Sequence, residues 1–184
     1  MSVKNSSWKR SEANSMERVN KIIRHPRFCG ELDRLHEIEK DRAFCGHGMG
    51  HLLDVARIAY ILCLESNESC EKELIYAAAM LHDVGRARQY EDGTPHEKES
   101  AAIAAEILPE CGFSGPETDL ILEAILAHRT RSGSGGGGLS ALLYRADKLS
   151  RMCFAGVDKQ ERRRFDCAAI DECYWELKNQ ALVY

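Results

Sequence analysis

The sequence lacks any apolar run long enough to cross a membrane. A bilayer-spanning helix needs roughly 20 consecutive apolar residues, and no segment of the 184-residue chain approaches that length. The first residues are polar and contain no apolar signal-peptide core. We therefore expect a cytoplasmic protein that has no membrane partner.

A strong excess of either charge is also missing. The net charge is -4, and the isoelectric point is near 6.0. Proteins that bind nucleic acid or anionic membranes through general electrostatics usually carry a clear positive balance. The charge balance therefore predicts no nucleic-acid partner.

Closely spaced cysteine pairs of the Cys-x-x-Cys type do not occur among the eight cysteines. Irregular spacing and the absence of a secretion signal favour reduced thiols, some of them packed as small hydrophobic residues. A cysteine-rich metal site is the alternative interpretation. Its ligands would be Cys45, Cys153, Cys167 and Cys173.

Strand signals are absent as well. No segment alternates cleanly between apolar and polar residues, and no Asn-Gly hairpin signal occurs. Apolar residues instead recur at helical spacing through most of the chain. The sequence predicts an all-α bundle of about seven or eight helices, forming a single domain over residues 16–184 after a flexible N-terminus at 1–15.

Each predicted helix follows from its own apolar stripe and flanking signals. Residues 71–83 are apolar nearly all round, so this helix should lie at the centre of the domain. Thr94 should be the N-cap of the next, with Pro95 as its first residue and Glu97 closing a capping box. Residues 86–93 and 132–138 are expected to be loops. The predicted helices cover residues 15–24, 27–40, 52–65, 71–83, 94–110, 114–128, 139–154 and 167–180.

Histidine and aspartate residues occur mainly at the ends of these predicted helices. Because neighbouring helices alternate in direction, their ends can converge on one cleft. Neutral imidazoles mixed with carboxylates suit Mn, Fe, Co, Ni or Zn and exclude a purely oxygen-ligated calcium site. The sequence therefore predicts a divalent transition-metal site of one or two ions. Its candidate ligands are His51, His82, Asp83, His96, His128 and Asp147.

Several of these residues also have simpler interpretations. A charged His82 at a helix C-terminus would interact favourably with the helix dipole. His51 could be a buried residue at a helix start, and His96 and His128 could be surface residues or could orient other ligands. Asp147 lies in an apolar stripe, where an unpaired carboxylate would be costly to bury.

Three segments in a fixed order resemble the HD-domain metal-dependent phosphohydrolase superfamily. They are HLLDVA from His51, LHDVGR from Leu81 and YRADKL from Tyr144, within a core of about residues 45–155. The resemblance implies that His51, His82, Asp83 and Asp147 hold the first ion. It also implies that Asp83 bridges to a second ion, which His96 and His128 hold.

The superfamily's usual reaction implies hydrolysis of a phosphate ester in a nucleotide or small phosphorylated metabolite. A metal-activated hydroxide would attack phosphorus, with Asp83 and His82 as catalytic residues. Cationic side chains beside the ligands could bind phosphate or be solvated. His47 is expected either in an exposed turn or as an outer substrate contact. The cationic candidates are Arg86, Lys148, Arg129 and Arg145.

Other functions stay open at this point. No Gly-Tyr-Pro follows the His-Asp pair, which argues against the branch that hydrolyses cyclic dinucleotides. Some HD-like proteins resemble this chain in ligand set but hold two irons and activate oxygen. A non-catalytic sensor or interaction domain is the third alternative. Assembly into a homodimer is also left open.

Overall fold

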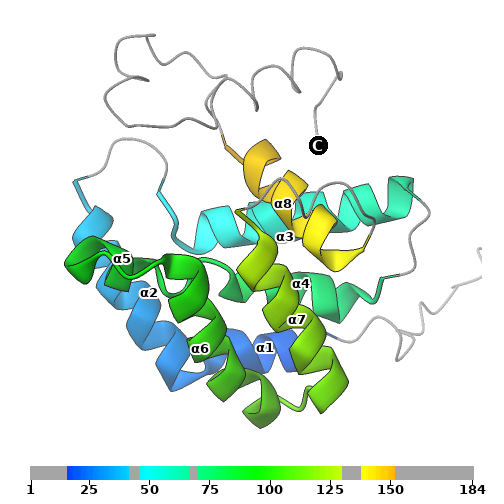
Figure 1. Cartoon of the computed structure of the whole chain (residues 1–184), viewed down its shortest axis with the longest axis horizontal. Coiled ribbons are helices and arrows are strands. Elements are labelled where there is room, and N and C mark those ends of the chain that lie inside the picture. Colours follow the sequence, from blue (N-terminus) through cyan, green and yellow to red (C-terminus); the bar gives the residue numbers. More distant parts are fainter. Residues whose placement is uncertain (1–15, 42–45, 67–69, 130–137, 152–184) are drawn as a thin grey trace, which may run out of the picture.

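The computed structural model describes residues 16–41, 46–66, 70–129 and 138–151. These residues form eight helices and no strand, which confirms the predicted all-α class (Figure 1). The predicted helix at 167–180, the N-terminal segment 1–15 and the four cysteines of the alternative metal site lie outside the described residues, as does most of the predicted loop at 132–138. The helices are α1 (Glu17–Arg24), α2 (Pro26–Glu39), α3 (Met49–Glu65), α4 (Lys72–Leu81), α5 (Arg86–Asp92), α6 (His96–Glu110), α7 (Gly115–Ala127) and α8 (Leu139–Leu149).

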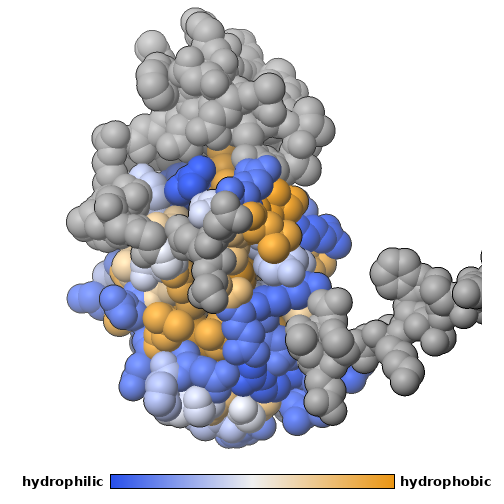
Figure 2. Space-filling model, turned by 90° about the vertical axis from the view of Figure 1, so that its right-hand side faces the viewer, coloured by the Kyte–Doolittle hydropathy of each residue, from blue (hydrophilic) through white to orange (hydrophobic). Residues whose placement is uncertain are grey.

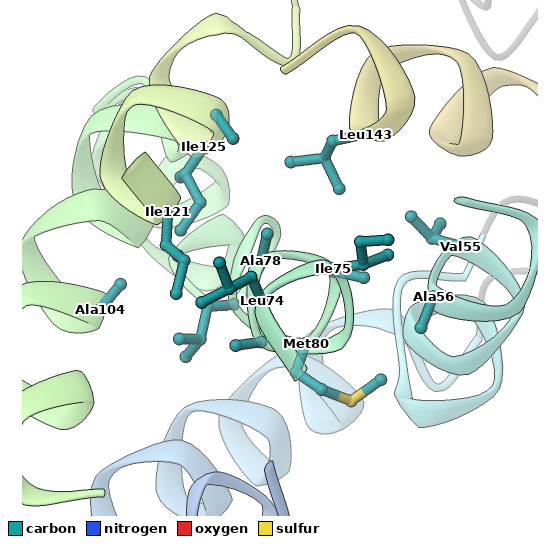
Figure 3. Packing of buried hydrophobic residues seen from close by; sticks show 14 of the residues in the cluster. Val55, Ala56, Leu74, Ile75, Ala78, Met80, Ala104, Ile121, Ile125 and Leu143 are labelled. Carbon is teal, nitrogen blue, oxygen red and sulfur yellow. The ribbon is translucent and has the colours of Figure 1, made fainter. Parts of the chain in front are cut away.

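Helix α4 is the centre of the molecule, as its apolar sequence predicts. It packs against α1, α3, α6, α7 and α8 (Figure 1). Its side chains meet Val55 of α3, Ile121 of α7 and Leu143 of α8 (Figure 3). Ile75 of α4 is completely buried, and burial of one such side chain contributes roughly 1.5–3 kcal/mol. Eight of the ten residues of α4 are buried, and the residues that follow it lie in the interior.

The predicted loop at residues 86–93 is wrong, because Arg86–Asp92 forms helix α5. Ala87 is buried, and Gly93 ends the helix with φ of +81°. The backbone N–H of Gly85 donates to Ser100 Oγ at 2.9 Å. A Cβ atom on Gly85 would lie 2.4 Å from the backbone nitrogen of Ser100. This close approach docks α5 onto α6, and so short a charged helix has no apolar stripe that sequence periodicity could detect.

The predicted start of the next helix is also corrected. Helix α6 begins at His96 with Pro95 as its N-cap, and no side chain caps it. The N–H of Thr94 donates instead to Asp92 Oδ1 at 3.0 Å, so Thr94 belongs to the turn after α5. The predicted start near Ser114 is confirmed, and Ser114 and Glu117 form a reciprocal capping box there.

Helix α8 ends at Leu149, earlier than the predicted end at residue 154. Ser150 Oγ donates to the carbonyl of Asp147 at 2.9 Å and so satisfies a carbonyl of the last turn. Among the described residues, no helix combines the length and apolar character that membrane crossing requires. Few large apolar side chains within the described ranges are exposed, and the face in Figure 2 shows apolar patches interspersed with hydrophilic residues.

Candidate metal centre

The structure brings all six predicted ligands together in the interior. His51 lies in the first turn of α3, His96 is the first residue of α6, and Asp147 lies within α8. His82 directly follows α4 and His128 directly follows α7, with Asp83 next to His82. Their potential ligand atoms form two groups, and the atoms within each group lie within 4.8 Å of one another. The groups are His51, His82, Asp83 and Asp147, and Asp83, His96 and His128.

The two carboxylates of this centre are almost completely buried. Asp83 is 1% exposed and Asp147 is 2% exposed. Among the described residues, neither Oδ atom of Asp83 has a hydrogen-bond partner, and nor do Asp147 Oδ1 and the Nε2 atoms of His51 and His82. Buried polar atoms without partners are costly. Five such atoms, spread over the two ligand groups, fit a centre that binds divalent cations.

Backbone carbonyls orient two of the histidines. His82 Nδ1 lies 2.7 Å from the carbonyl oxygen of Ala79, and His128 Nδ1 lies 2.5 Å from that of Ile125. A carbonyl oxygen only accepts, so each Nδ1 carries the proton and donates it. Nε2 is therefore the nitrogen of each ring that faces the centre, and its lone pair is available to a metal when the ring is neutral.

Ser150, which the sequence analysis did not single out, orients a third histidine. Its hydroxyl donates to the carbonyl of Asp147 at 2.9 Å and lies 3.2 Å from His51 Nδ1. Because its proton is already used, Ser150 Oγ accepts from Nδ1–H, which makes Nε2 the available ligand atom of the neutral His51 ring. The signal in the sequence is only a hydroxyl three residues after a predicted ligand.

Both carboxylates are ionised despite their burial. Burial alone would raise the pKa of Asp83, but Arg86 and His82 hold that pKa well below its usual range. Burial likewise opposes ionisation of Asp147, but contacts with His82 and Arg151 keep the pKa of Asp147 well below its usual range. Burial, together with His82, lowers the pKa of His128 to about 4. The centre therefore offers two anionic and at least one neutral ligand at pH 7.

Three cationic side chains surround the carboxylates. Arg86 Nη2 lies 3.2 Å from Asp83 Oδ2, and Lys148 Nζ lies 3.3 Å from Asp147 Oδ2. Arg151, which was not predicted, approaches the same Asp147 oxygen at 2.9 Å. Its position four residues after Asp147, one helical turn further on, is the signal that could have identified it.

The remaining predicted cations lie further out. Arg129 is half exposed and pairs with Glu97 at 3.3 Å. Since Glu97 Oε2 lies 3.8 Å from His96 Nδ1, Arg129 stands at the edge of the centre. Arg145 is half-buried on α8, two residues before Asp147.

The expected exposed turn position of His47 is wrong, because only 8% of the residue is exposed. Glu39 at the end of α2 accepts from the backbone N–H of His47 at 2.7 Å and contacts its Nδ1 at 2.6 Å. Burial raises the pKa of Glu39, but these contacts with His47 outweigh it and lower the pKa to about 2. The ring of His47 lies 5.5 Å from that of His51, centroid to centroid. This pairing draws His47 inward beside the centre.

Comparison with known proteins agrees with this arrangement. The family model of the HD domain matches residues 48–158, more than half of the chain. The chain belongs to the HD-domain family. The predicted superfamily is thereby confirmed, and the buried cluster is compatible with the divalent metal that was expected.

Relatives of this HD-domain protein differ in how much of their length they share with it. An uncharacterized protein of Clostridium beijerinckii is 42% identical over 171 residues, which cover 92% of this chain and 100% of the relative. Ribonuclease Y 1 of Levilactobacillus brevis is 28% identical over 127 residues, 61% of this chain but only 24% of that protein.

A solved structure shares the fold. The crystal structure of a predicted HD superfamily hydrolase from an uncultured Thermotogales bacterium has a TM-score of 0.54 with this chain at 22% sequence identity. The match covers 88% of this chain and 93% of that one. At this identity the likeness concerns the HD fold alone.

Proposed function

We propose that this HD-domain protein is a metal-dependent phosphohydrolase that cleaves a phosphate ester of a nucleotide or small phosphorylated metabolite. The observation that carries the proposal is the set of buried ligand atoms without hydrogen bonds, enclosed by cationic side chains. A bound metal cation would satisfy the buried ligand atoms, and the surrounding cationic side chains would attract an anionic substrate. Family membership supports a metal-dependent hydrolase independently of this geometry.

Asp83 would serve both metal positions, because its two carboxylate oxygens face different groups of ligands. Its Oδ2 faces the first group, at 3.6 Å from His51 Nε2 and 3.5 Å from His82 Nε2. Its Oδ1 faces the second group, at 3.1 Å from His96 Nε2 and 3.8 Å from His128 Nε2. We assign the first position to His51, His82, Asp83 and Asp147, and the second to Asp83, His96 and His128.

Divalent ions bound there would activate a water and polarise the phosphoryl oxygens, which is the chemistry that ester hydrolysis needs. The mixed imidazole and carboxylate set suits Mn, Fe, Co, Ni or Zn. Asp83 and His82 are the proposed catalytic residues because they would bind the metal at the reacting centre. Both directly follow the buried helix α4. Arg86 and Lys148 place positive charge where the negative charge of a phosphate group would develop.

Metal-free protein reloaded in turn with Mn, Fe, Co, Ni or Zn as the divalent ion tests this proposal. The substrates would be a panel of nucleoside monophosphates, nucleoside triphosphates and sugar phosphates, with released phosphate as the readout. We expect hydrolysis that depends on the added metal and is lost with a chelator. No hydrolysis of any member with any of the five metals would refute the proposal.

Two added arms separate the other functions. An oligoribonucleotide tests for the kind of substrate that the name of the ribonuclease relative suggests, and its cleavage in preference to the small phosphates would replace the proposed substrate class. Protein loaded anaerobically with iron and then exposed to oxygen tests for an oxygenase. Oxygen consumption without phosphate release would favour that alternative.

A further inference from the structure

The second metal position contains an unusual contact between two histidines. The Nε2 atoms of His96 and His128 lie 3.1 Å apart, and both also face Asp83 Oδ1. The Nδ1 proton of His128 is held by the carbonyl of Ile125, so its Nε2 is a bare lone pair. Whether His96 can share a metal ion with it depends on which of its own nitrogens carries the proton.

Gln89 of α5 is placed where its side chain can set the tautomer of His96. The amide oxygen of Gln89 contacts His96 Nδ1. An oxygen in this place accepts a proton from Nδ1, so Nε2 is the nitrogen of the neutral ring whose lone pair can bind a metal. The amide nitrogen in the same place would instead donate to Nδ1, and the proton on Nε2 would then block the ligand. The docking of Gly85 on Ser100 is what brings α5, and Gln89 with it, to His96.

The two metal positions differ in how their histidines are held. A main-chain carbonyl orients His82 in the first position, and Ser150, which is anchored to α8, orients His51. Two carboxylates also serve that position, whereas Asp83 is the one carboxylate of the second among the residues that the structure describes. Of the two histidines in the second position, His96 relies on the side chain of a separate short helix. The second position should therefore be the more sensitive to a single side-chain change.

We propose that Gln89 is a positioning residue for the second metal ion. By accepting the Nδ1 proton of His96, Gln89 makes the position of Asp83, His96 and His128 competent to bind, while the first position does not depend on it. The inference rests on the two-ion centre of the proposed function. A change in an outer residue of this kind typically weakens metal binding by roughly 10–100-fold.

Titration of the metal-free, full-length protein with Mn²⁺ tests the inference, with free Mn²⁺ measured by electron paramagnetic resonance. We expect the wild type to bind two ions. Gln89→Met keeps the length of the side chain and removes the acceptor. We expect this variant to bind its first ion with unchanged affinity and its second roughly 10–100-fold more weakly. Gln89→Ala provides the same test if the methionine variant does not fold.

Gln89→Glu is the rescue variant, because a carboxylate only accepts and so keeps the proton on His96 Nδ1. We expect it to retain both ions. Arg88→Gln is the matched control: it makes the same change of charge at the neighbouring, exposed position of α5, and it should also retain both ions.

Three outcomes would overturn the assignment of Gln89. They are equal second-ion affinity in wild type and Gln89→Met, loss of the second ion in Gln89→Glu, and a wild type that binds a single ion. A wild type that binds no ion would remove both this inference and the proposed function. Two ions that respond to Gln89 as expected, in a protein that hydrolyses no phosphate ester, would leave the inference intact and refute only the proposed function.

Discussion

The two ends of α4 carry charged clusters with opposite properties. At its N-terminal end, Arg18 of α1 binds Glu73 at 2.5 Å and Glu71 at 3.2 Å, and it also binds Glu117 of α7 at 2.6 Å. The guanidinium group lies 4.4 Å from the centre of the Phe113 ring. At the C-terminal end, both oxygens of Asp83 are buried and, among the described residues, without hydrogen bonds.

The difference between these clusters separates a structural role from a functional one. The Arg18 cluster satisfies its carboxylates and joins α1, α4 and α7, as a stabilising network should. The Asp83 cluster leaves its atoms unsatisfied in the most buried part of the fold, where that costs the most. Residue type alone would not distinguish the two, since both combine acidic side chains with arginine.

Asp83→Asn should have the largest effect on function. An amide replaces one acceptor oxygen with a donor group and removes the charge shared by both metal positions, so bound metal and phosphate release should both fall at least roughly 100-fold, beyond the range for outer residues. Metal analysis and the phosphate assay measure this, and circular dichroism should show unchanged helix content. Asp54→Asn makes the same change on an exposed carboxylate of α3 and should alter neither. Equal metal content in the two variants would contradict the role of Asp83.

Gly85→Ala should have a large effect on stability. Its Cβ atom would meet the backbone of Ser100 at 2.4 Å, which no side-chain rotation can relieve, and overpacking of this kind costs about 1–3 kcal/mol. Urea denaturation of the metal-free protein measures the loss. In Gly30→Ala the new Cβ meets nothing within 4 Å, so this helical control should be more stable than wild type by roughly 0.5–1 kcal/mol. A tolerated Gly85→Ala would show that α5 is not held by this contact.

Arg18→Met should destabilise the cluster at the N-terminal end of α4 without affecting the metal centre at its C-terminal end. Loss of the guanidinium group removes charge-assisted hydrogen bonds to Glu73 and Glu117 and should lower the free energy of unfolding by about 1–3 kcal/mol. Mn²⁺ affinity in the folded protein should stay unchanged, because the cluster lies at the other end of the helix. Lys21→Met breaks an exposed pair with Glu17 and should cost about 0.5 kcal/mol or less. Weakened metal binding in Arg18→Met would show that the two ends are coupled.

The smallest expected effect concerns the pH dependence of stability. Hydrogen bonds from Ser114 and Arg18 lower the pKa of Glu117 to about 2. Its ionised form therefore stabilises the fold above its ordinary pKa of 4.5, and that stabilisation is lost as the pH falls toward 2. Glu117→Gln should flatten the decline between these values, because glutamine can still close the capping box without titrating. Urea denaturation of both proteins at several pH values from 6 to 2 gives the free energy of unfolding at each pH. If this free energy falls equally with pH in the two proteins, Glu117 makes no such contribution.

Much of the candidate centre was predictable because its ligands lie in a fixed order along the chain, mainly at the ends of predicted helices. His51, the His82–Asp83 pair and Asp147 stand in an order that carried the family resemblance. The all-helical class followed from periodic apolar residues, which reflect one-sided burial wherever helices pack. Short α5 was missed because a charged segment with a single fully buried residue has no such stripe.

The sequence by itself determined the helical class, the HD family and the set of metal-binding side-chain types, because these depend on local periodicity and on residue order. Only the tertiary structure decided how those side chains are held. The contacts of Gln89 with His96 and of Ser150 with His51 join separate helices. The pairing of Glu39 with His47 joins α2 to the segment before α3. Such pairs arise from the angles at which helices pack, and the spacing of residues along one helix does not specify those angles.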